Sequence, residues 1–231
     1  MKTQDVPVVE LDWGATFRLV PSRFPPISLF ERVADPADLE VVYAIEALTN
    51  PRLRQEVGEI SLVPPEERMS GAGSSPIMAA FTHLNPAGSR FTNGSYGVYY
   101  AARTLLTAVR EVGYHQARFL AATNEPAISI DMRCYKAVVR QPMHDLRGMA
   151  DTLRAIYDPD DYTAAQAFGA KLRAVPSWGV AYDSVRDAGG ECVGIFRPLA
   201  LAPTVQGQHV TLQWNGEQIE SWYVKSDLHK L

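Results

Sequence analysis

The sequence predicts a mixed α+β fold. Helical patterns occupy the first two thirds of the chain, whereas the last third carries several β segments in succession, separated by glycine turns. Helices and strands do not alternate regularly, as they would in a parallel βαβ fold. The chain has 231 residues, 46% of them hydrophobic and 21% charged, and no linker separates two compositions. A chain of this length can bury a core of its own, so we expect a single domain over residues 1–231.

The N-terminal part is expected to start with a strand over residues 16–20, which stops at the following proline because proline cannot donate to a sheet ladder. A helical elaboration is then expected over about 35–84. Its first helix begins with Asp35 as N-cap and Pro36 at the first helical position, and it continues to about Leu48.

The rest of the chain shows clearer periodicities. Apolar residues at helical spacing predict a long helix over 104–121, and strict alternation predicts a long strand over 127–140. The other expected elements are a helix from Ser75-Pro76, two short strands around Asn93-Gly94, one or two helices within 146–174, and strands in SWGVAYDSV, ECVGIFRPLAL, HVTLQWN and EQIESWYVK.

Composition excludes several classes of protein. The 22 Lys and Arg residues against 26 Asp and Glu give a formal charge of −4 without clusters of one sign, which disfavours nonspecific binding to nucleic acid or to an anionic membrane. The N-terminus lacks the apolar stretch of a secretory signal, and no window approaches the roughly 18 apolar residues of a membrane span. Cys134 and Cys192, the two cysteines of the chain, lie in predicted strands, and neither belongs to a CxxC pair or lies near a second thiol in the sequence. We expect buried, reduced thiols in a soluble cytoplasmic protein.

Common catalytic motifs are absent. The glycine cluster over 71–76 lacks the preceding strand and third glycine of a dinucleotide loop, and the Gly-Lys-Ser/Thr ending of a phosphate loop. The five histidines are scattered without metal-ligand spacing, so no metal is expected. No GxSxG nucleophile motif occurs.

Four polar residues lie beside predicted β segments and glycine turns: Arg90, Tyr100, Glu111 and Ser184. Each has an ordinary structural interpretation. Arg90 is typical of a surface ion pair, and Tyr100 of an aromatic residue in the core. Glu111 could make an exposed contact with His115, one helical turn away. Ser184 could be only a turn hydroxyl. Taken one at a time, they do not indicate a function.

Together, these residues resemble the RES-domain family, bacterial toxins of toxin–antitoxin modules whose name records an arginine, a glutamate and a serine. The resemblance rests on GSRFTNGSYGVYYAARTLLTAVRE and AYDSVRDAGGECVGIFRP. Arg90 to Tyr100 is ten positions and Tyr100 to Glu111 is eleven, as in the family pattern. The match covers approximately Phe17 to Pro198, with a longer insert over 35–84 than in minimal members.

The resemblance implies an ADP-ribosyltransferase-like fold, a split β-sheet core with flanking helices. It also implies an enzyme that consumes NAD as a substrate and holds no permanent cofactor. Cleavage of the nicotinamide–ribose bond would pass ADP-ribose to water, to phosphate or to a protein target, and the sequence leaves these three acceptors open. A cognate antitoxin with a DNA-binding helix-turn-helix region would be the partner, and a second copy of the chain is a further expected contact.

The resemblance also implies roles for individual residues. Glu111 would stabilise the ribosyl cation, Arg90 would bind pyrophosphate or ribose oxygens, and Tyr100 and Ser184 would contact nicotinamide or its ribose. Further candidates for NAD binding are Arg18, Arg23 and His83.

Two other interpretations stay open at this point. One is a noncatalytic partner-binding module that kept the fold and lost turnover. The other is a hydrolase or glycosidase of small metabolites, which the spacing of the motif does not favour.

Overall fold

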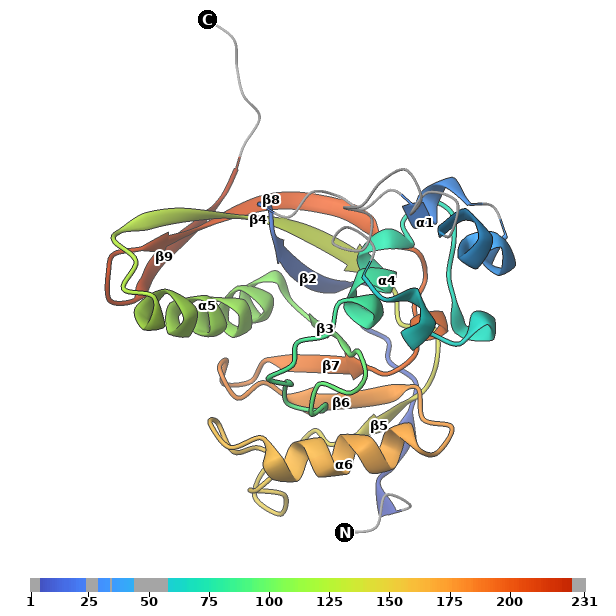
Figure 1. The fold of residues 1–231 in the computed structure, drawn as a ribbon. Coiled ribbons are helices and arrows are strands. Elements are labelled where there is room, and N and C mark those ends of the chain that lie inside the picture. Colours follow the sequence, from blue (N-terminus) through green and yellow to red (C-terminus); the bar gives the residue numbers. More distant parts are fainter. Residues whose placement is uncertain (1–4, 24–28, 34, 44–57, 226–231) are drawn as a thin grey trace, which may run out of the picture.

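The computed structural model describes residues 5–23, 29–33, 35–43 and 58–225. These residues form a mixed α+β structure with one nine-stranded sheet in the order β1-β5-β6-β7-β3-β2-β4-β8-β9 (Figure 1). The strands are β1 (Val8–Val9), β2 (Thr16–Pro21), β3 (Tyr99–Ala102), β4 (Ile128–Ala137), β5 (Met143–Asp145), β6 (Gly179–Asp183), β7 (Glu191–Ile195), β8 (Val205–Trp214) and β9 (Ile219–Val224). The α-helices include α1 (Leu29–Arg32), α4 (Ser75–Thr82), α5 (Leu105–Ala122) and α6 (Thr163–Arg173), with short 3₁₀ turns at η2 (Pro36–Asp38), η3 (Ile60–Leu62), η4 (Pro65–Glu67) and η5 (Pro198–Ala200).

The sheet is almost divided into two halves. Strands β2 and β3 share the single residue pair Phe17–Ala102, whereas β2 and β4 pair over six residues. One half contains β1, β5, β6, β7 and β3, and the other contains β2, β4, β8 and β9. This arrangement confirms the expected split core with flanking helices.

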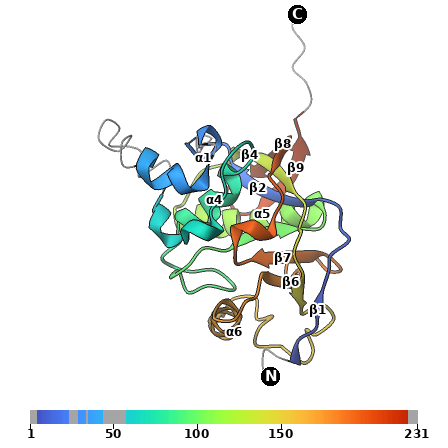
Figure 2. The same ribbon diagram turned by 90° about the vertical axis from the view of Figure 1, so that its right-hand side faces the viewer.

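Helices cover the two halves from different sides. Helix α5 lies between the β4-β8-β9 layer and the β6-β7 layer in both views, and α6 packs beyond β5 and β6 (Figures 1 and 2). Alternation along β3 divides its side chains between two hydrophobic clusters, because successive side chains point to opposite faces. Tyr99 packs with α4 in one cluster, while Tyr100 packs with α5 and α6 in the other.

Several predicted elements are confirmed by the structure. The long helix is α5, and Thr104 is its N-cap, accepting a hydrogen bond from the Thr107 amide at 3.1 Å. The long strand is β4. Asp35 caps its short helix by accepting from the Ala37 amide at 2.9 Å. The helix there continues over 39–43, and the part predicted up to Leu48 lies outside the described residues.

One prediction about the middle of the chain was wrong, and in another the predicted helical region is longer than the helix observed. The strand expected before Asn93-Gly94 is a turn, in which Ser89 and Thr92 form an isolated bridge. Residues 146–162 form turns, and the only helix described within 146–174 is α6. In the first case, the Tyr100 hydroxyl accepts from the Phe91 amide, so a side chain replaces the neighbouring strand that the sequence pattern suggested.

The start of α4 also differs from the expectation. Ser74, not Ser75, is the N-cap, and Ser75 occupies the first helical position before Pro76. No helix among the described residues is long and apolar enough to cross a membrane.

Two glycines within helices give a matched test of the packing. A Cβ on Gly169 of α6 would lie 2.2 Å from the backbone oxygen of Phe91, whereas a Cβ on Gly113 of α5 would meet nothing within 4 Å. We expect Gly169→Ala to lower the free energy of unfolding by about 1–3 kcal/mol through overpacking. Gly113→Ala should raise it by about 0.5–1 kcal/mol, because alanine favours the helix. Urea denaturation measures both, and equal stability of Gly169→Ala and the parent would contradict the packing described.

Candidate functional site

Glu111 and Ser184 meet between α5 and the end of β6. The Ser184 hydroxyl donates a hydrogen bond to Oε1 of Glu111 at 2.5 Å. The Sγ of Cys192, on the adjacent strand β7, lies 3.9 Å from the same oxygen. The thiol is buried, and burial raises the pKa of Cys192 above its ordinary value, with Glu111 adding to the increase. A neutral thiol and a serine hydroxyl therefore surround one oxygen of the carboxylate.

The hydroxyl of Ser184 has a fixed orientation. Its oxygen accepts hydrogen bonds from the amides of Arg186 at 3.1 Å and Asp187 at 2.9 Å. A serine hydroxyl has one proton and two acceptor positions. Because both acceptor positions are occupied, the proton is directed to Glu111.

Arg90 organises the segment that follows β5. Its Nη1 donates to the carbonyl oxygens of Ile156 at 3.0 Å and Asp158 at 2.9 Å, and its guanidinium lies 4.6 Å from the centre of the Tyr162 ring. The residue is 8% exposed. The surface ion pair considered from the sequence is therefore not its environment.

His115, one helical turn after Glu111, reports which charges gather here. The His115 side chain is exposed to solvent, but neighbouring groups shield its ring in part, and this partial burial lowers the pKa of His115. The charge of Glu111 raises that pKa, and the positive charges of Arg186, Arg118 and Arg90 lower it. The charges of Glu111 and Arg90, which are 21 positions apart in the sequence, therefore both act on the His115 ring beside α5.

Side-chain contacts join α5 and the loop after Ser184 to the segment that Arg90 holds. Tyr114 of α5 donates to Asp160 at 2.7 Å, and Arg186 donates to the carbonyl of Pro159. The guanidinium of Arg186 also lies 3.4 Å from the centre of the Tyr114 ring. These contacts link α5, the loop after Ser184 and the segment that Arg90 holds.

Tyr100 holds the turn that carries Arg90. Its hydroxyl shares a hydrogen bond with the Ser89 hydroxyl at 2.8 Å and accepts from the Phe91 amide at 2.9 Å. Burial raises the pKa of Tyr100 above its ordinary value. The phenol is therefore neutral, and it fixes the residues on both sides of Arg90.

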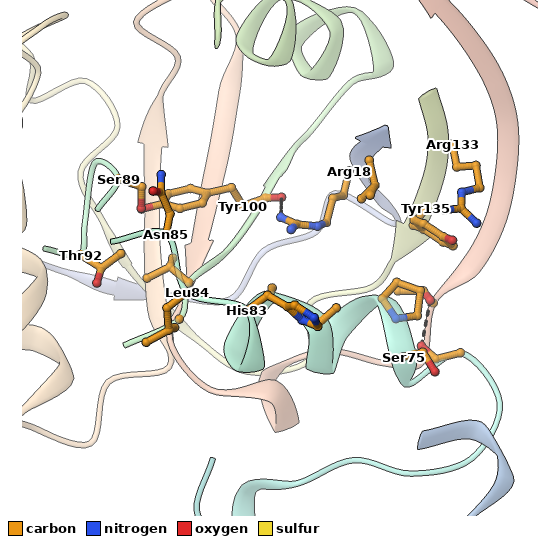
Figure 3. Close-up of a pocket in the computed structure, with 18 of the residues that line it drawn as sticks. Arg18, Ser75, His83, Leu84, Asn85, Ser89, Thr92, Tyr100, Arg133 and Tyr135 are labelled. Atoms are coloured by element: carbon orange, nitrogen blue, oxygen red, sulfur yellow. Dashed lines mark hydrogen bonds between the residues drawn. The ribbon is translucent and has the colours of Figure 1, made fainter. Parts of the chain in front are cut away.

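A cavity of about 710 Å³ lies next to this turn, between the two halves of the sheet and α4 (Figure 3). Arg18 of β2 points across it and donates from Nη1 to the Tyr100 carbonyl at 3.0 Å. Arg133 of β4 and His83, at the end of α4, also line the cavity. Apolar walls come from Val20, Pro76, Ala79, Ala80, Leu84 and Val98.

The structure therefore separates the residues expected to form one site. Arg18, His83 and Tyr100 line the cavity, while Glu111, Ser184 and Arg90 gather beside α5, with Tyr100 in contact with the Arg90 turn. Arg23 does not line the cavity, and its guanidinium lies 5.7 Å from the centre of the Phe119 ring.

Sequence reasoning missed the residues that support this arrangement. Asp187, Arg186 and Tyr114 take part through tertiary contacts alone. The Gly189-Gly190 pair was a signal of a tight loop near Ser184, but it did not show which residues the loop would contact. Among the described residues, no three His, Cys, Asp or Glu side chains lie together where they could hold a metal ion. Cys134 and Cys192 are both free and buried, as expected.

Comparisons with known proteins agree with the motif. The RES domain family model matches residues 65–215, and the chain belongs to this family. It is 31% identical over 216 residues to the uncharacterized protein y4oC of Sinorhizobium fredii, covering 91% of this chain and 87% of that protein. A crystal structure of the M. tuberculosis MbcT-MbcA toxin-antitoxin complex matches with a TM-score of 0.48 and 14% identity, covering 90% of this chain and 87% of the other.

Neighbouring tyrosines on β3 provide a test of the Arg90 turn. We expect Tyr100→Phe to lower the free energy of unfolding by about 1–3 kcal/mol, because it leaves the buried Phe91 amide without its acceptor. Tyr99→Phe is the control, since the buried Tyr99 hydroxyl has no hydrogen-bond partner among the described residues. That variant should be as stable as the parent or more stable. Equal losses in the two variants, measured by chemical denaturation, would contradict the assigned hydrogen bonds.

Proposed function

We propose that the protein is the NAD-consuming toxin of a toxin–antitoxin module and that it cleaves the nicotinamide–ribose bond of NAD. The observation that supports this most directly is the Glu111 carboxylate, which accepts a hydrogen bond from Ser184 at 2.5 Å. Arg90 holds the adjoining segment, which Tyr114 of α5 and Arg186 also contact. The RES family assignment supports the same conclusion.

The chemistry explains why a carboxylate is needed. The nicotinamide–ribose bond breaks through a transition state that resembles an oxocarbenium ion, and a nearby negative charge stabilises it. Nicotinamide leaves as a neutral ring, so the second, general-acid carboxylate of ordinary glycosidases is not required. In our proposal, Ser184 occupies one oxygen of Glu111 and leaves the other for the ribose.

The cavity is the proposed place for part of the dinucleotide. Its volume of about 710 Å³ falls within the range of small-molecule sites. Arg18 and Arg133 supply positive charge for a pyrophosphate, since guanidinium groups pair well with oxyanions. The two hydrogen bonds of Arg90 to the protein both use Nη1, and its other N–H groups are proposed to bind the ribose.

An antitoxin is the proposed partner. The MbcT toxin was crystallised with the MbcA antitoxin, and we propose a comparable pairing for this chain in the cytoplasm. A formal charge of −4 is consistent with a helix-turn-helix region for DNA binding that belongs to the antitoxin.

The first test of this function is Glu111→Gln. We expect the rate of NAD loss to fall by about 10²–10⁴, since positioned acid/base groups contribute factors of this size. The control is Glu125→Gln, at an exposed position just after α5, which should keep the parent rate. Thermal melting checks that both variants fold, and full turnover in folded Glu111→Gln would remove Glu111 from the mechanism.

The acceptor of ADP-ribose can be identified with the same protein. Labelled NAD is incubated with the purified chain, with and without phosphate and with cell lysate. Free ADP-ribose, its phosphorylated form or a labelled protein band would indicate hydrolysis, phosphorolysis or protein ADP-ribosylation. Absence of NAD loss under all three conditions would instead favour the noncatalytic partner-binding module.

Arg90→Lys is the second test. Lysine cannot donate to two carbonyl groups while presenting a flat cation to Tyr162, so the 156–162 segment should loosen. We expect turnover of NAD to fall at least tenfold and the KM for NAD to rise. Arg154→Lys, at an exposed position just before this segment, is the matched control. Parent-like kinetics of Arg90→Lys would contradict the role assigned to the guanidinium.

A further inference from the structure

We propose that Asp187 is a positioning residue that holds Ser184 against Glu111. The inference rests on the proposed function for its kinetic consequence, whereas its structural part concerns the loop over 184–190 alone. Asp187 lies in the second RES-like segment, but it is not one of the four residues for which the resemblance implies a role. Its hydrogen-bond partners are groups other than the Glu111 carboxylate.

The carboxylate of Asp187 is buried against the beginning of α5. Its Oδ2 accepts a hydrogen bond from the Thr107 hydroxyl at 2.7 Å, and its Oδ1 accepts from Nη1 of Arg110. Its side chain is 8% exposed. Thr107 precedes Glu111 by four residues, so the two lie one turn apart on the same face of the helix. Asp187 therefore ties its loop to the helical face that carries Glu111.

The backbone of the same loop fixes Ser184. The Asp187 amide donates to the Ser184 hydroxyl at 2.9 Å. The Ser184 amide in turn donates to the Gly190 carbonyl, and the Gly190 amide donates to the Asp187 carbonyl, both at 2.8 Å. Movement of Asp187 away from α5 would thus remove one of the two amides that orient the serine proton toward Glu111.

Gly190 shows how closely this loop approaches the helix. A Cβ at this position would lie 2.7 Å from Oδ2 of Asp187 and 2.7 Å from Cγ2 of Thr107. Contacts this short do not occur between real side chains, so a larger residue here would displace the side chain of Asp187 or of Thr107. The loop therefore packs closely against α5 at Gly190, and this close packing keeps Ser184 in place.

Asp131 provides a matched comparison in the other half of the sheet. It accepts from the Thr211 hydroxyl at 2.8 Å and from Nζ of Lys225 at 2.5 Å. Its partners are thus of the same kinds as those of Asp187, a threonine hydroxyl and a cation. Asp131 lies on β4, which pairs with β2 and β8 in the other half of the sheet from the Ser184 loop, and it is therefore the control for loss of a bonded carboxylate.

The experiment compares Asp187→Asn with Asp131→Asn in the full chain. We expect kcat for NAD loss to fall by about 10- to 100-fold in Asp187→Asn, because small displacements of catalytic groups cost factors of this order. The KM should change less than threefold. Asp131→Asn should keep kcat within twofold. An unchanged kcat for Asp187→Asn, or a loss that appears mainly in KM, would overturn the proposal.

A double-mutant cycle separates positioning from general stabilisation. In a Ser184→Ala background the serine is already absent, so Asp187→Asn should lower kcat by less than threefold further. If Asp187→Asn instead lowers kcat by the same factor in the Ser184→Ala background as in the parent, Asp187 does not act through Ser184. Thr107→Val, which removes the hydroxyl donor and keeps the shape of the side chain, should lower kcat in the same direction. It replaces Asp187→Asn in the cycle if that variant does not fold.

Hydrogen exchange distinguishes a failure of this inference from a failure of the proposed function. If the parent chain does not consume NAD, the proposed function fails, and the positioning role is judged from exchange rates alone. Asp187→Asn should accelerate exchange of the Arg186 amide at least tenfold while amides in β4 and β8 keep their parent rates. Unchanged exchange at Arg186 would overturn the positioning role.

Discussion

The hydrogen bond from Ser184 to Glu111 depends on the relative position of α5 and the β6-β7 turn. Glu111 is carried by a helix that begins directly after β3, whereas Ser184 follows β6, and β7 lies between these two strands in the sheet. The pairing of β3 with β7 and of β7 with β6 is antiparallel and regular over the length of each strand. This half of the sheet therefore provides a rigid frame, and the 2.5 Å contact results from that frame and from the loop that Asp187 attaches to α5.

The division of the sheet into two halves creates the cavity. Since β2 and β3 pair at one position, the halves diverge beyond it and leave space that α4 closes from one side. Arg18 spans the divergence by donating to the Tyr100 carbonyl. Tyr100 connects the cavity with the catalytic candidates, because its carbonyl binds Arg18 while its hydroxyl orders the turn of Arg90. In the account proposed here, a dinucleotide in the cavity approaches Glu111 past this tyrosine.

Features that depend on contacts between residues close in the sequence could be predicted, whereas features that depend on tertiary contacts could not. Periodicity and capping are local, so α5, β4 and the C-terminal strands could be predicted, and so could Asp35 as an N-cap. Arg90, Tyr100 and Glu111 could be selected because their spacing along the chain is local, and Ser184 because it lies in a second segment that resembles the RES family. The turn around Arg90 was predicted as a strand because its decisive hydrogen bond comes from Tyr100, a contact that alternation of residue types does not reveal. Asp187, Arg186 and Tyr114 escaped prediction for the same reason, and so did the separation of Arg18 and His83 from Glu111.

The most direct test of the central claim is a crystal structure of the Glu111→Gln variant with NAD bound. Our account predicts the nicotinamide ribose within hydrogen-bond distance of residue 111, with Ser184 beside it and the pyrophosphate near Arg18. A dinucleotide bound elsewhere on the protein, with residues 111 and 184 free of contact, would contradict it.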